Sequence, residues 1–447
     1  MDYAKNKCYL CGRKKLYKFM DEYKPRIADI LLQERLDAFG AVLIEGAKAC
    51  GKSTTAIQQA KSVLKMDDPN HRNQYIELAN TDISILLSGD TPRLIDEWQL
   101  APKFWDAIRY TVDQRGKDGQ FILTGSAVPA KALSEGEMTH SGTGRYARLR
   151  MRPMSLWESG DSNGGISLQD LLDGKQGLHA ENPLNLEQMA FLICRGGWPR
   201  ALNKTTDKAA LLQSKEYVRS IVESDISRVD GIERNPERAL NVMRSYARNI
   251  GSQASIATIR DDISENEGAT ISDSTIISYI NALKQIFVVE DVQAWNPNLR
   301  SKTAIRTTET RYFVDPSVAT AAMGISPQNL IYDTKTMGFF FENLAVRDLR
   351  IYAEALDGKV EHYRDKNNLE CDIIVRLSNG KFGLMEVKLG SDKGIKEGVE
   401  TLNTLTQRLQ PGAKYTPAFR AVVTATGQYA YQRSDGIYIL PLGCLKP

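Results

Sequence analysis

Residues 41–56 read AVLIEGAKACGKSTTA, in which an apolar run passes through a glycine-framed loop into a segment that can begin a helix. Gly46 and Gly51 allow the backbone to bend round a phosphate group, and the loop amides would point inward as donors. Lys52 would reach the β- and γ-phosphates of ATP and Ser53 would hold Mg²⁺. The stretch predicts a nucleotide-binding loop made of Gly46, Ala47, Lys48, Ala49, Cys50, Gly51, Lys52, Ser53 and Thr54.

Acidic residues that an ATPase needs opposite such a loop follow about 40 residues later. An apolar strand ending in Asp96 and Glu97 would place Asp96 to hold Mg²⁺ and Glu97 to polarise the attacking water. A buried strand that happens to end in acids is the alternative, but the upstream loop favours the functional interpretation. The next strand ends in polar residues, where Thr124 or Ser126 would contact the γ-phosphate or the water, or act as ordinary turn residues.

The loop at residues 139–150 is rich in glycine and arginine. Arg145, or second Arg148, is a candidate finger, because a guanidinium on a loop can bridge to a neighbouring subunit's γ-phosphate and stabilise transition-state charge. Both arginines could equally cap the domain surface. If a finger acts between subunits, the ATP-bound protein is a homo-oligomer.

Length and composition limit the class of protein. A chain of 447 residues is too long for one hydrophobic core, so about two to four domains are expected. The formal charge of +3 excludes a globally basic chain, so any nucleic-acid surface has to be local. No apolar run approaches the roughly 20 residues of a membrane span and no signal-peptide core is present, which predicts a cytoplasmic protein without a membrane partner. Six scattered cysteines argue against a disulfide framework.

Cys8 and Cys11 near the N-terminus are spaced like half of a zinc ribbon. A structural zinc ion needs four ligands, and no second Cys-x2-Cys or His pair follows. A solvated cysteine pair and a zinc shared with another subunit or a distant residue both remain open.

The middle of the chain has helical character. Residues 186–229 predict helices, interrupted at residues 195–199, RGGWP, which break any helix. Residues 236–289 look like a winged helix, with three helices, the third capped by Ser272, and an apolar strand at 286–290. The third helix could dock in a major groove, although its thinly basic face equally allows a role in protein packing.

The last third returns to a mixed α/β pattern with a second group of candidate catalytic residues. Asp372 would lie across a hairpin from Glu386 and Lys388, which share one face of a strand. Two carboxylates can bind Mg²⁺ and a lysine can steady the developing charge, with Glu342 on the preceding helix as a further acid. The element order predicts a nuclease-like fold. Whether it cleaves or only binds stays open, since Glu and Lys two apart also fit an ordinary edge strand.

These motifs together resemble prokaryotic AAA-type ATPases that carry a C-terminal domain of unknown function. The stretches that carry the resemblance are GAKACGKS (46–53), RLIDE (93–97), LTGS (123–126), GGWP (196–199) and FVDP (313–316). The resemblance covers roughly residue 23 to the end. It implies an AAA+ P-loop NTPase core, a helical lid, a winged helix and a C-terminal restriction-endonuclease-like α/β domain of the PD-(D/E)XK type.

The α/β chain is accordingly divided into five parts. They are a cysteine-containing extension (1–22), the P-loop ATPase core (23–185), the helical lid (186–235), the winged helix (236–300) and the restriction-endonuclease-like domain (301–447). Residues 159–165, SGDSNGG, have the composition of a flexible connector.

Two functions are compatible with this organisation. In the first, ATP and Mg²⁺ drive an enzyme that acts on nucleic acid through a metal-dependent, nuclease-like domain. In the second, the ATP state switches assembly or partner docking, and the C-terminal parts only bind. ATP hydrolysis stimulated by DNA would distinguish them.

Overall fold

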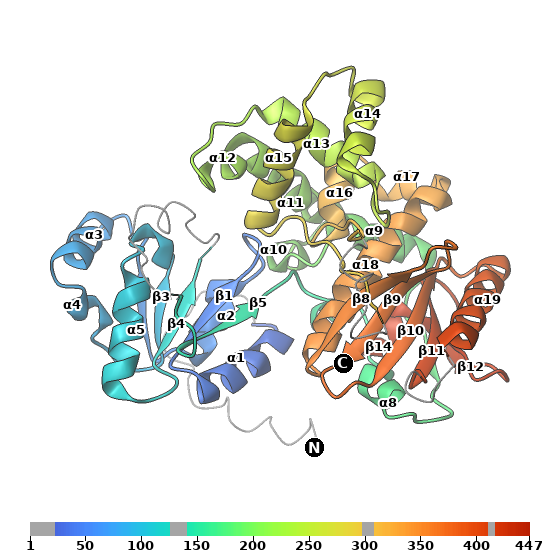
Figure 1. Ribbon diagram of the computed structural model, residues 1–447, viewed down its shortest axis with the longest axis horizontal. Coiled ribbons are helices and arrows are strands. Elements are labelled where there is room, and N and C mark those ends of the chain that lie inside the picture. The colour runs from blue at the N-terminus through green and yellow to red at the C-terminus, as the bar shows by residue number, and fades with distance from the viewer. Residues whose placement is uncertain (1–22, 126–140, 297–307, 410–415) are drawn as a thin grey trace.

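The computed structural model describes residues 23–125, 141–296, 308–409 and 416–447. In Figure 1 a sheet near the N-terminus lies at the left, a larger sheet from the C-terminal part lies at the right, and α-helices of the middle region lie above. None of the helices in these ranges is long and apolar enough to cross a membrane.

The first sheet is parallel and has the strand order β2-β3-β4-β1-β5. Its strands are β1 (Ala41–Glu45), β2 (Ser62–Lys65), β3 (Arg93–Asp96), β4 (Phe121–Thr124) and β5 (Tyr146–Arg150). Every residue of the central β1 is buried, which explains its continuous apolar run. The helices of this part are α1 (Ile27–Ala38), α2 (Lys52–Gln59), α3 (Arg72–Thr81), α4 (Ile83–Leu87) and α5 (Phe104–Arg115).

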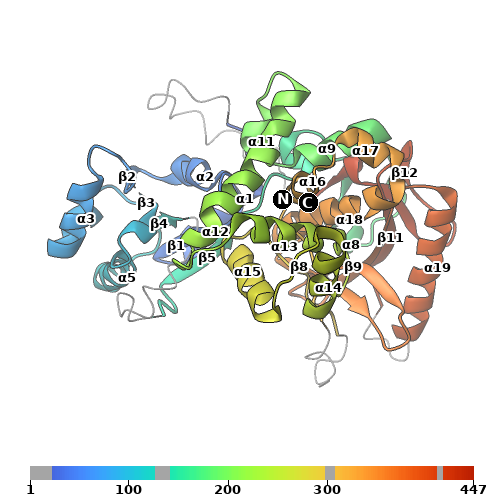
Figure 2. The same ribbon diagram turned by 90° about the horizontal axis from the view of Figure 1, so that it is seen from above.

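Helices dominate the middle region, which Figure 2 shows from above. They are α9 (Leu186–Arg195), α10 (Pro199–Leu202), α11 (Asp207–Ser220), the π-helix η3 (Ile221–Asp225), α12 (Ile226–Arg228), α13 (Pro236–Arg248), α14 (Ile256–Glu267) and α15 (Asp273–Gln285). The hydroxyl of Ser272 caps α15, as expected from the sequence. Residues 286–290 were expected as a strand, but their only pairing within the described ranges is an isolated bridge from Val289 to Phe313. A second isolated bridge joins Val292 to Thr310 just after this stretch.

The second sheet has seven strands in the order β7-β12-β13-β11-β10-β9-β8. The chain enters it through α16 (Pro316–Met323), α17 (Pro327–Tyr332) and α18 (Thr334–Glu354). It then runs through β8 (Gly358–Arg364), β9 (Glu370–Leu377), β10 (Phe382–Lys388), α19 (Asp392–Leu409), β11 (Phe419–Thr424), β12 (Tyr429–Gln432) and β13 (Tyr438–Pro441). Strands β8, β9 and β10 are antiparallel neighbours, whereas β10 and β11 are parallel.

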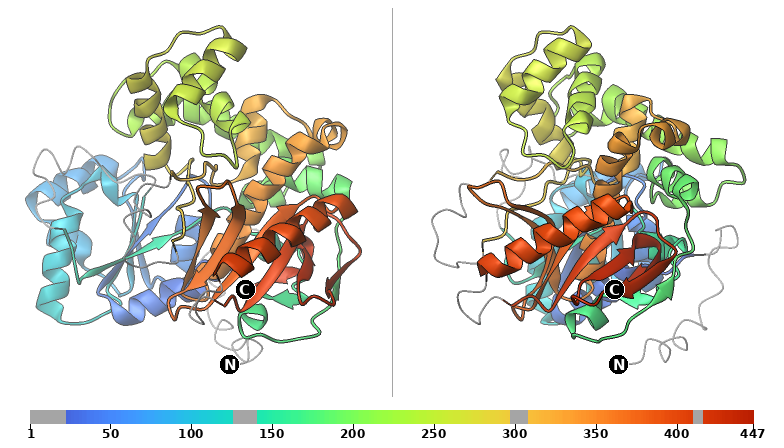
Figure 3. Two further views of the ribbon diagram at one scale, coloured as in Figure 1. Left: turned by 45° about the vertical axis from the view of Figure 1, so that its right-hand side comes forward. Right: turned by 90° about the vertical axis from the view of Figure 1, so that its right-hand side faces the viewer.

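Two helices cover opposite faces of the second sheet. Ile374 on β9 packs in one apolar cluster with Leu402 of α19, while the adjacent Ile373 belongs to the cluster that contains Phe341 of α18. Successive strand residues point to opposite faces, so α18 and α19 sandwich the sheet. Figure 3 shows α19 lying across the outer face.

Residues 166–181, expected to belong to the ATPase core, pair with C-terminal strands instead. β7 (Ala180–Glu181) pairs with β12, and β6 (Ile166–Ser167) pairs with β14 (Leu445–Lys446), so this stretch packs on the C-terminal sheet. The expected connector at 159–165 is also packed, since the buried Ser162 hydroxyl donates to the carbonyl of Leu445 at 2.7 Å. Composition predicted a linker because glycine and serine give no local sign of such distant partners.

Candidate functional site

The phosphate-binding loop joins β1 to α2 at the carboxyl edge of the parallel sheet. Gly46 and Gly51 have φ of +154° and +108°, values that side chains rarely allow. A Cβ on Gly46 would lie 2.0 Å from the carbonyl oxygen of Met151, so the loop also needs glycine for close packing. The buried Lys52 ammonium donates to the carbonyls of Gly46 and Ala47 at 2.8 and 2.9 Å, which places it inside the curve of the loop.

Asp96 at the end of β3 faces the loop. Its Oδ1 accepts hydrogen bonds from Ser53 Oγ at 2.7 Å and from Thr124 Oγ1 at 2.5 Å. The structure thus brings together a hydroxyl and a carboxylate from the predicted magnesium ligands, with the predicted sensor threonine beside them. Oxygen ligands of this kind suit Mg²⁺. The other candidate sensor, Ser126, lies outside the described residues, as do Cys8 and Cys11.

Glu97 follows Asp96 in a left-handed conformation with φ of +57°. Such strain in a non-glycine residue is typical of functional sites. The Gln99 amide donates to Glu97 Oε2 at 2.5 Å. Burial raises the pKa of Glu97, and the charge of Asp96 raises it further against the opposing Gln99 hydrogen bond. The position of Gln99 was not apparent from the sequence.

Arg26, which precedes α1, is a further residue of this site that the sequence analysis missed. Its guanidinium donates to the carbonyls of Cys50 and Arg152 at 3.0 and 2.9 Å and bonds the Glu158 carboxylate at 3.1 Å. It therefore ties the phosphate-binding loop to the chain that leaves β5. A lone arginine before a helix carries no motif, so only the fold reveals this contact.

The loop also contacts the middle region. Lys48 Nζ pairs with Asp225 of the π-helix η3 at 2.6 Å. A Cβ on Gly51 would lie 3.6 Å from the ring of Pro199, which belongs to the GGWP motif. The expected lid residues thus lie directly against the phosphate-binding loop.

The two candidate finger arginines lie on β5 and just before it. Arg145 Nε bonds Asp113 Oδ1 at 2.7 Å, and this hydrogen bond lowers the pKa of Asp113. Because Tyr146 pairs with Ala41 at the start of β1, Arg145 lies at the amino edge of the sheet, away from its own chain's phosphate-binding loop. Arg148 Nη1 bonds Glu45 Oε1 at 2.5 Å.

Asp372, Glu386 and Lys388 come together on β9 and β10. Lys388 Nζ lies 2.9 Å from Glu386 Oε2 and 3.6 Å from Asp372 Oδ2, and Asp372 also accepts from the Val387 amide at 2.8 Å. Burial raises the pKa of Glu386, and the charge of Asp372 adds to this. Burial would lower the pKa of Lys388, but the two carboxylates outweigh it and raise that pKa. The ammonium therefore lies close to both carboxylates.

Glu342 on α18 approaches the same group. Burial raises the pKa of Glu342, and the charge of Asp372 raises it further. Within the described ranges, no set of three or more His, Cys, Asp or Glu side chains has the arrangement of a metal site. Asp372 and Glu386 nevertheless form a carboxylate pair, and the buried Glu386 Oε1 has no hydrogen-bond partner among the described residues. An unpartnered carboxylate oxygen of this kind fits a cation.

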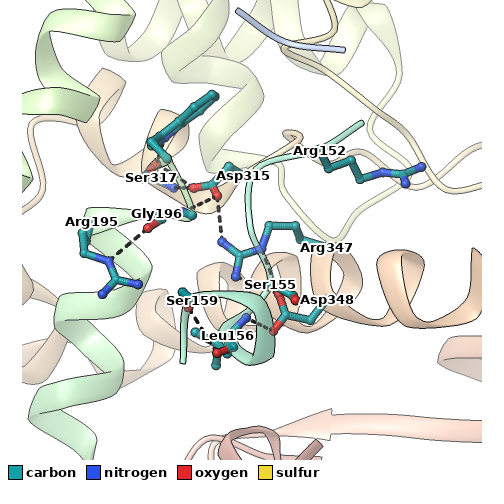
Figure 4. A network of polar contacts seen from close by, with 12 residues as sticks. Arg152, Ser155, Leu156, Ser159, Arg195, Gly196, Asp315, Ser317, Arg347 and Asp348 are labelled. Carbon is teal, nitrogen blue, oxygen red and sulfur yellow. Dashed lines mark hydrogen bonds and ion pairs between the residues drawn. The ribbon is translucent and has the colours of Figure 1, made fainter. Parts of the chain in front are cut away.

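A buried joint connects the middle region, the segment after β5 and α18 (Figure 4). Asp315 Oδ2 accepts from the Gly197 amide at 2.9 Å and from Arg347 Nη1 at 2.7 Å. Arg347 also bonds Asp348 Oδ1 at 2.7 Å, and Asp348 Oδ2 accepts from the Leu156 amide at 2.9 Å. The GGWP and FVDP motifs therefore belong to one buried polar network that positions α18 against the ATPase part.

Three sequence families match consecutive parts of the chain. Residues 38–159 match a family described as an AAA domain. Residues 186–329 and 337–445 each match a domain of unknown function, DUF8612 and DUF4143 respectively. The DUF8612 match spans the residues of both the expected lid and the expected winged helix.

Some solved structures are similar at low identity, and no curated protein matches the sequence. The Walker-type ATPase of Pyrococcus abyssi is 15% identical, with a TM-score of 0.40, over 66% of this chain and 94% of that one. The ORC2 protein of Aeropyrum pernix, in its ADPNP-ADP complexes, is 11% identical, with a TM-score of 0.30, over 69% of this chain and 93% of that one.

The AAA-domain match covers the phosphate-binding loop, the acids at the end of β3 and the whole parallel sheet. Together with the strand order and the clustering of Ser53, Asp96 and Thr124, it assigns a function to this part. Residues 38–159 form an AAA-type P-loop ATPase domain that binds ATP, followed by two domains of unknown function.

Proposed function

We propose that the protein is a Mg²⁺-dependent ATPase whose C-terminal domain acts on phosphodiester bonds of nucleic acid. The observation that carries the second part is the convergence of Asp372, Glu386 and Lys388 on neighbouring strands. The order α18-β8-β9-β10-α19-β11, with β11 parallel to β10, supports the restriction-endonuclease-like fold expected from the sequence.

In the ATPase site, Lys52 and the loop amides hold the phosphates, and Ser53 and Asp96 would hold Mg²⁺, which neutralises phosphate charge. Glu97 takes the proton of the attacking water, for which its raised pKa suits it, because a base is most effective when its pKa lies close to the working pH. Thr124 donates a hydrogen bond to Asp96 and would contact the γ-phosphate or the attacking water.

The ATPase assignment is tested by two substitutions. Glu97→Gln should lower the hydrolysis rate about 100-fold or more and leave ATP binding intact, because it removes the general base only. Lys52→Ala should weaken binding itself. The measurements are phosphate release and retention of labelled ATP, with the exposed Glu77→Gln as control. Hydrolysis at the parental rate by Glu97→Gln would remove Glu97 from the mechanism.

In the C-terminal domain, Asp372 and Glu386 would hold Mg²⁺, whose chemistry there is to polarise the phosphodiester and activate water. Lys388 lies against both carboxylates, so its ammonium is placed to neutralise charge that develops on the phosphate. Cleavage of DNA or RNA with Mg²⁺ or Mn²⁺ should disappear in Asp372→Ala and Glu386→Ala, while the ATPase rate persists. Glu397→Ala, an exposed acid on α19, is the matched control. Equal cleavage by all variants would exclude this site.

A nucleotide-switched binding protein is the second candidate function. The buried joint favours it, because it links the ATPase part to α18 by direct hydrogen bonds. Under this alternative, ATP changes the affinity for a partner and the carboxylates need not turn over. Nucleic acid that raises the ATPase rate and is cut would favour the enzyme. A partner affinity that depends on ATP in Asp372→Ala as in the parent would favour the switch.

A further inference from the structure

The acidic side chains Glu342, Asp372 and Glu386 of the C-terminal domain lie beside residues of the preceding region, which matches DUF8612. Tyr312 lies in the segment that bridges Val289 and Val292, and its side chain is only 1% exposed. Its hydroxyl donates a short hydrogen bond to Glu342 Oε1. Its backbone is fixed as well, because the Glu290 amide donates to its carbonyl at 3.0 Å. The hydroxyl is therefore held in place from outside the C-terminal domain.

A second residue of the same region, Gly251, lies close to the Glu342 carboxylate. Gly251, just after α13, has φ of +70°, and a Cβ there would lie 2.9 Å from Glu342 Oε1. The Gly251 amide donates to the carbonyl of Arg311, the neighbour of Tyr312, at 3.0 Å. Gly251 and Tyr312 thus form one rigid surface against which Glu342 rests.

A small pocket opens between the two regions beside this contact. Gly251, Thr310 and Tyr312 line it from one side, and Glu342 and Asp372 line it from the other. The approach to the carboxylates is consequently shaped by residues that belong to different parts of the chain.

We propose that Tyr312 is a positioning residue that fixes the Glu342 carboxylate beside Asp372, so that the DUF8612-matching region shapes the approach of a metal ion to the Asp372 and Glu386 pair. This inference rests on the proposed metal-dependent function of that site. A carboxylate on a helix has several rotamers, and an oriented hydrogen-bond donor selects among them. Partners of this kind, one step removed from the ligands, hold metal-binding side chains in their working geometry.

A purely structural role is the competing explanation, in which the hydrogen bond only fastens two domains together. The two roles differ in what they do to metal binding. A fastening bond contributes equal stability with and without metal, whereas a positioning bond contributes to the affinity for the metal itself.

The test compares Tyr312→Phe with Tyr246→Phe in the full chain. Tyr246 is the matched control, because it is also buried and its hydroxyl also donates a short hydrogen bond to a carboxylate, that of Asp291. Mn²⁺ binding is measured by calorimetry, and the rise of the melting temperature on adding Mn²⁺ gives a second readout. The Mn²⁺ binding lost in Asp372→Ala identifies the part that belongs to this site rather than to the ATPase loop.

Tyr312→Phe should weaken Mn²⁺ binding at this site about tenfold or more, whereas Tyr246→Phe should bind Mn²⁺ as the parent does. Gly251→Ala should also weaken Mn²⁺ binding, because the added Cβ would lie 2.9 Å from Glu342 Oε1 and displace this carboxylate. The ATPase rate serves as the check that each variant is folded.

Unchanged Mn²⁺ affinity in Tyr312→Phe, with an equal loss of melting temperature in the presence and absence of metal, would overturn the proposal and leave the carboxylate site standing. A parent protein that binds no Mn²⁺ in a manner sensitive to Asp372→Ala would instead overturn the proposed nuclease-like function, and the role of Tyr312 with it.

Discussion

Asp315 shows how a single fully buried residue determines the arrangement of several elements. Its carboxylate has no exposed surface and is satisfied by Arg347, the Gly197 amide and the amide and hydroxyl of Ser317. Desolvation of this many charges is costly, so the network stabilises the fold only while every partner is present. Gly196 has φ of +73°, and a Cβ there would lie 2.5 Å from Asp315 Oδ1, which explains why glycine occupies this position.

Asp315→Ala should therefore lower the free energy of unfolding by about 3–5 kcal/mol, because it breaks a fully buried ion pair. Among the described residues, the Arg347 guanidinium then keeps only Asp348 as a carboxylate partner, and the buried Gly197 amide loses its acceptor. Chemical denaturation measures the change. Glu223→Ala is the control, since it breaks an exposed ion pair with Arg219 and should have little effect. A loss no greater for Asp315→Ala than for Glu223→Ala would show that the joint is not needed for stability.

At the level of elements, local patterns predicted well what depends on neighbours in the sequence. The phosphate-binding loop, the buried β3 with its terminal acids and the cap at Ser272 all follow from residues within a few positions of one another. The hairpin of β9 and β10 also formed as expected, and its register, in which Met385 pairs with Ile373, brings the neighbouring Asp372 and Glu386 close together. Alternation along β10 then puts Glu386 and Lys388 on one face.

Elements whose structure depends on distant partners were not predictable in the same way. Residues 286–290 are apolar enough for a strand, but in the described part of the chain only Val289 among them forms a bridge, an isolated one to Phe313. β7 joins β12 across almost 250 residues, which moved the boundary expected at 185. Arg26 and Tyr312 make buried side-chain contacts at 24 and 30 residues' separation, and no spacing rule covers such contacts. Tertiary packing decided all four.

The molecule as a whole places its two candidate catalytic centres in different sheets, joined through α18. Asp348 of the buried joint and Glu342, which lies beside Asp372, are both on this helix. They are six residues, or about 9 Å, apart along its axis. Burial raises the pKa of Asp348 to about 6 even against the opposing charge of Arg347. The buried joint and the C-terminal candidate centre therefore share one helix, which contacts both parts of the chain.

Arg145 lies at the amino edge of the first sheet and the phosphate-binding loop at the carboxyl edge, so Arg145 is away from the nucleotide site of its own chain. A head-to-tail contact between subunits would bring these two edges together. If Arg145 acts in this way, Arg145→Ala should slow hydrolysis about 10³-fold or more, and the parental rate per molecule should rise with protein concentration.

Mixing variants tests the arrangement directly. Lys52→Ala protein cannot hold ATP but still carries Arg145, whereas Arg145→Ala protein holds ATP but lacks the finger. A Lys52→Ala subunit can therefore supply the missing arginine to an Arg145→Ala subunit across a subunit contact. Random assembly of equal amounts should restore about a quarter of the parental activity, because half of the subunits bind ATP and half of those meet an intact arginine. Arg109→Ala is the matched control, since Arg109 bonds the same Asp113 as Arg145 and should hydrolyse ATP as the parent does. No restoration at any mixing ratio, or an equal loss in Arg109→Ala, would mean that Arg145 only fastens β5 to α5 within its own chain.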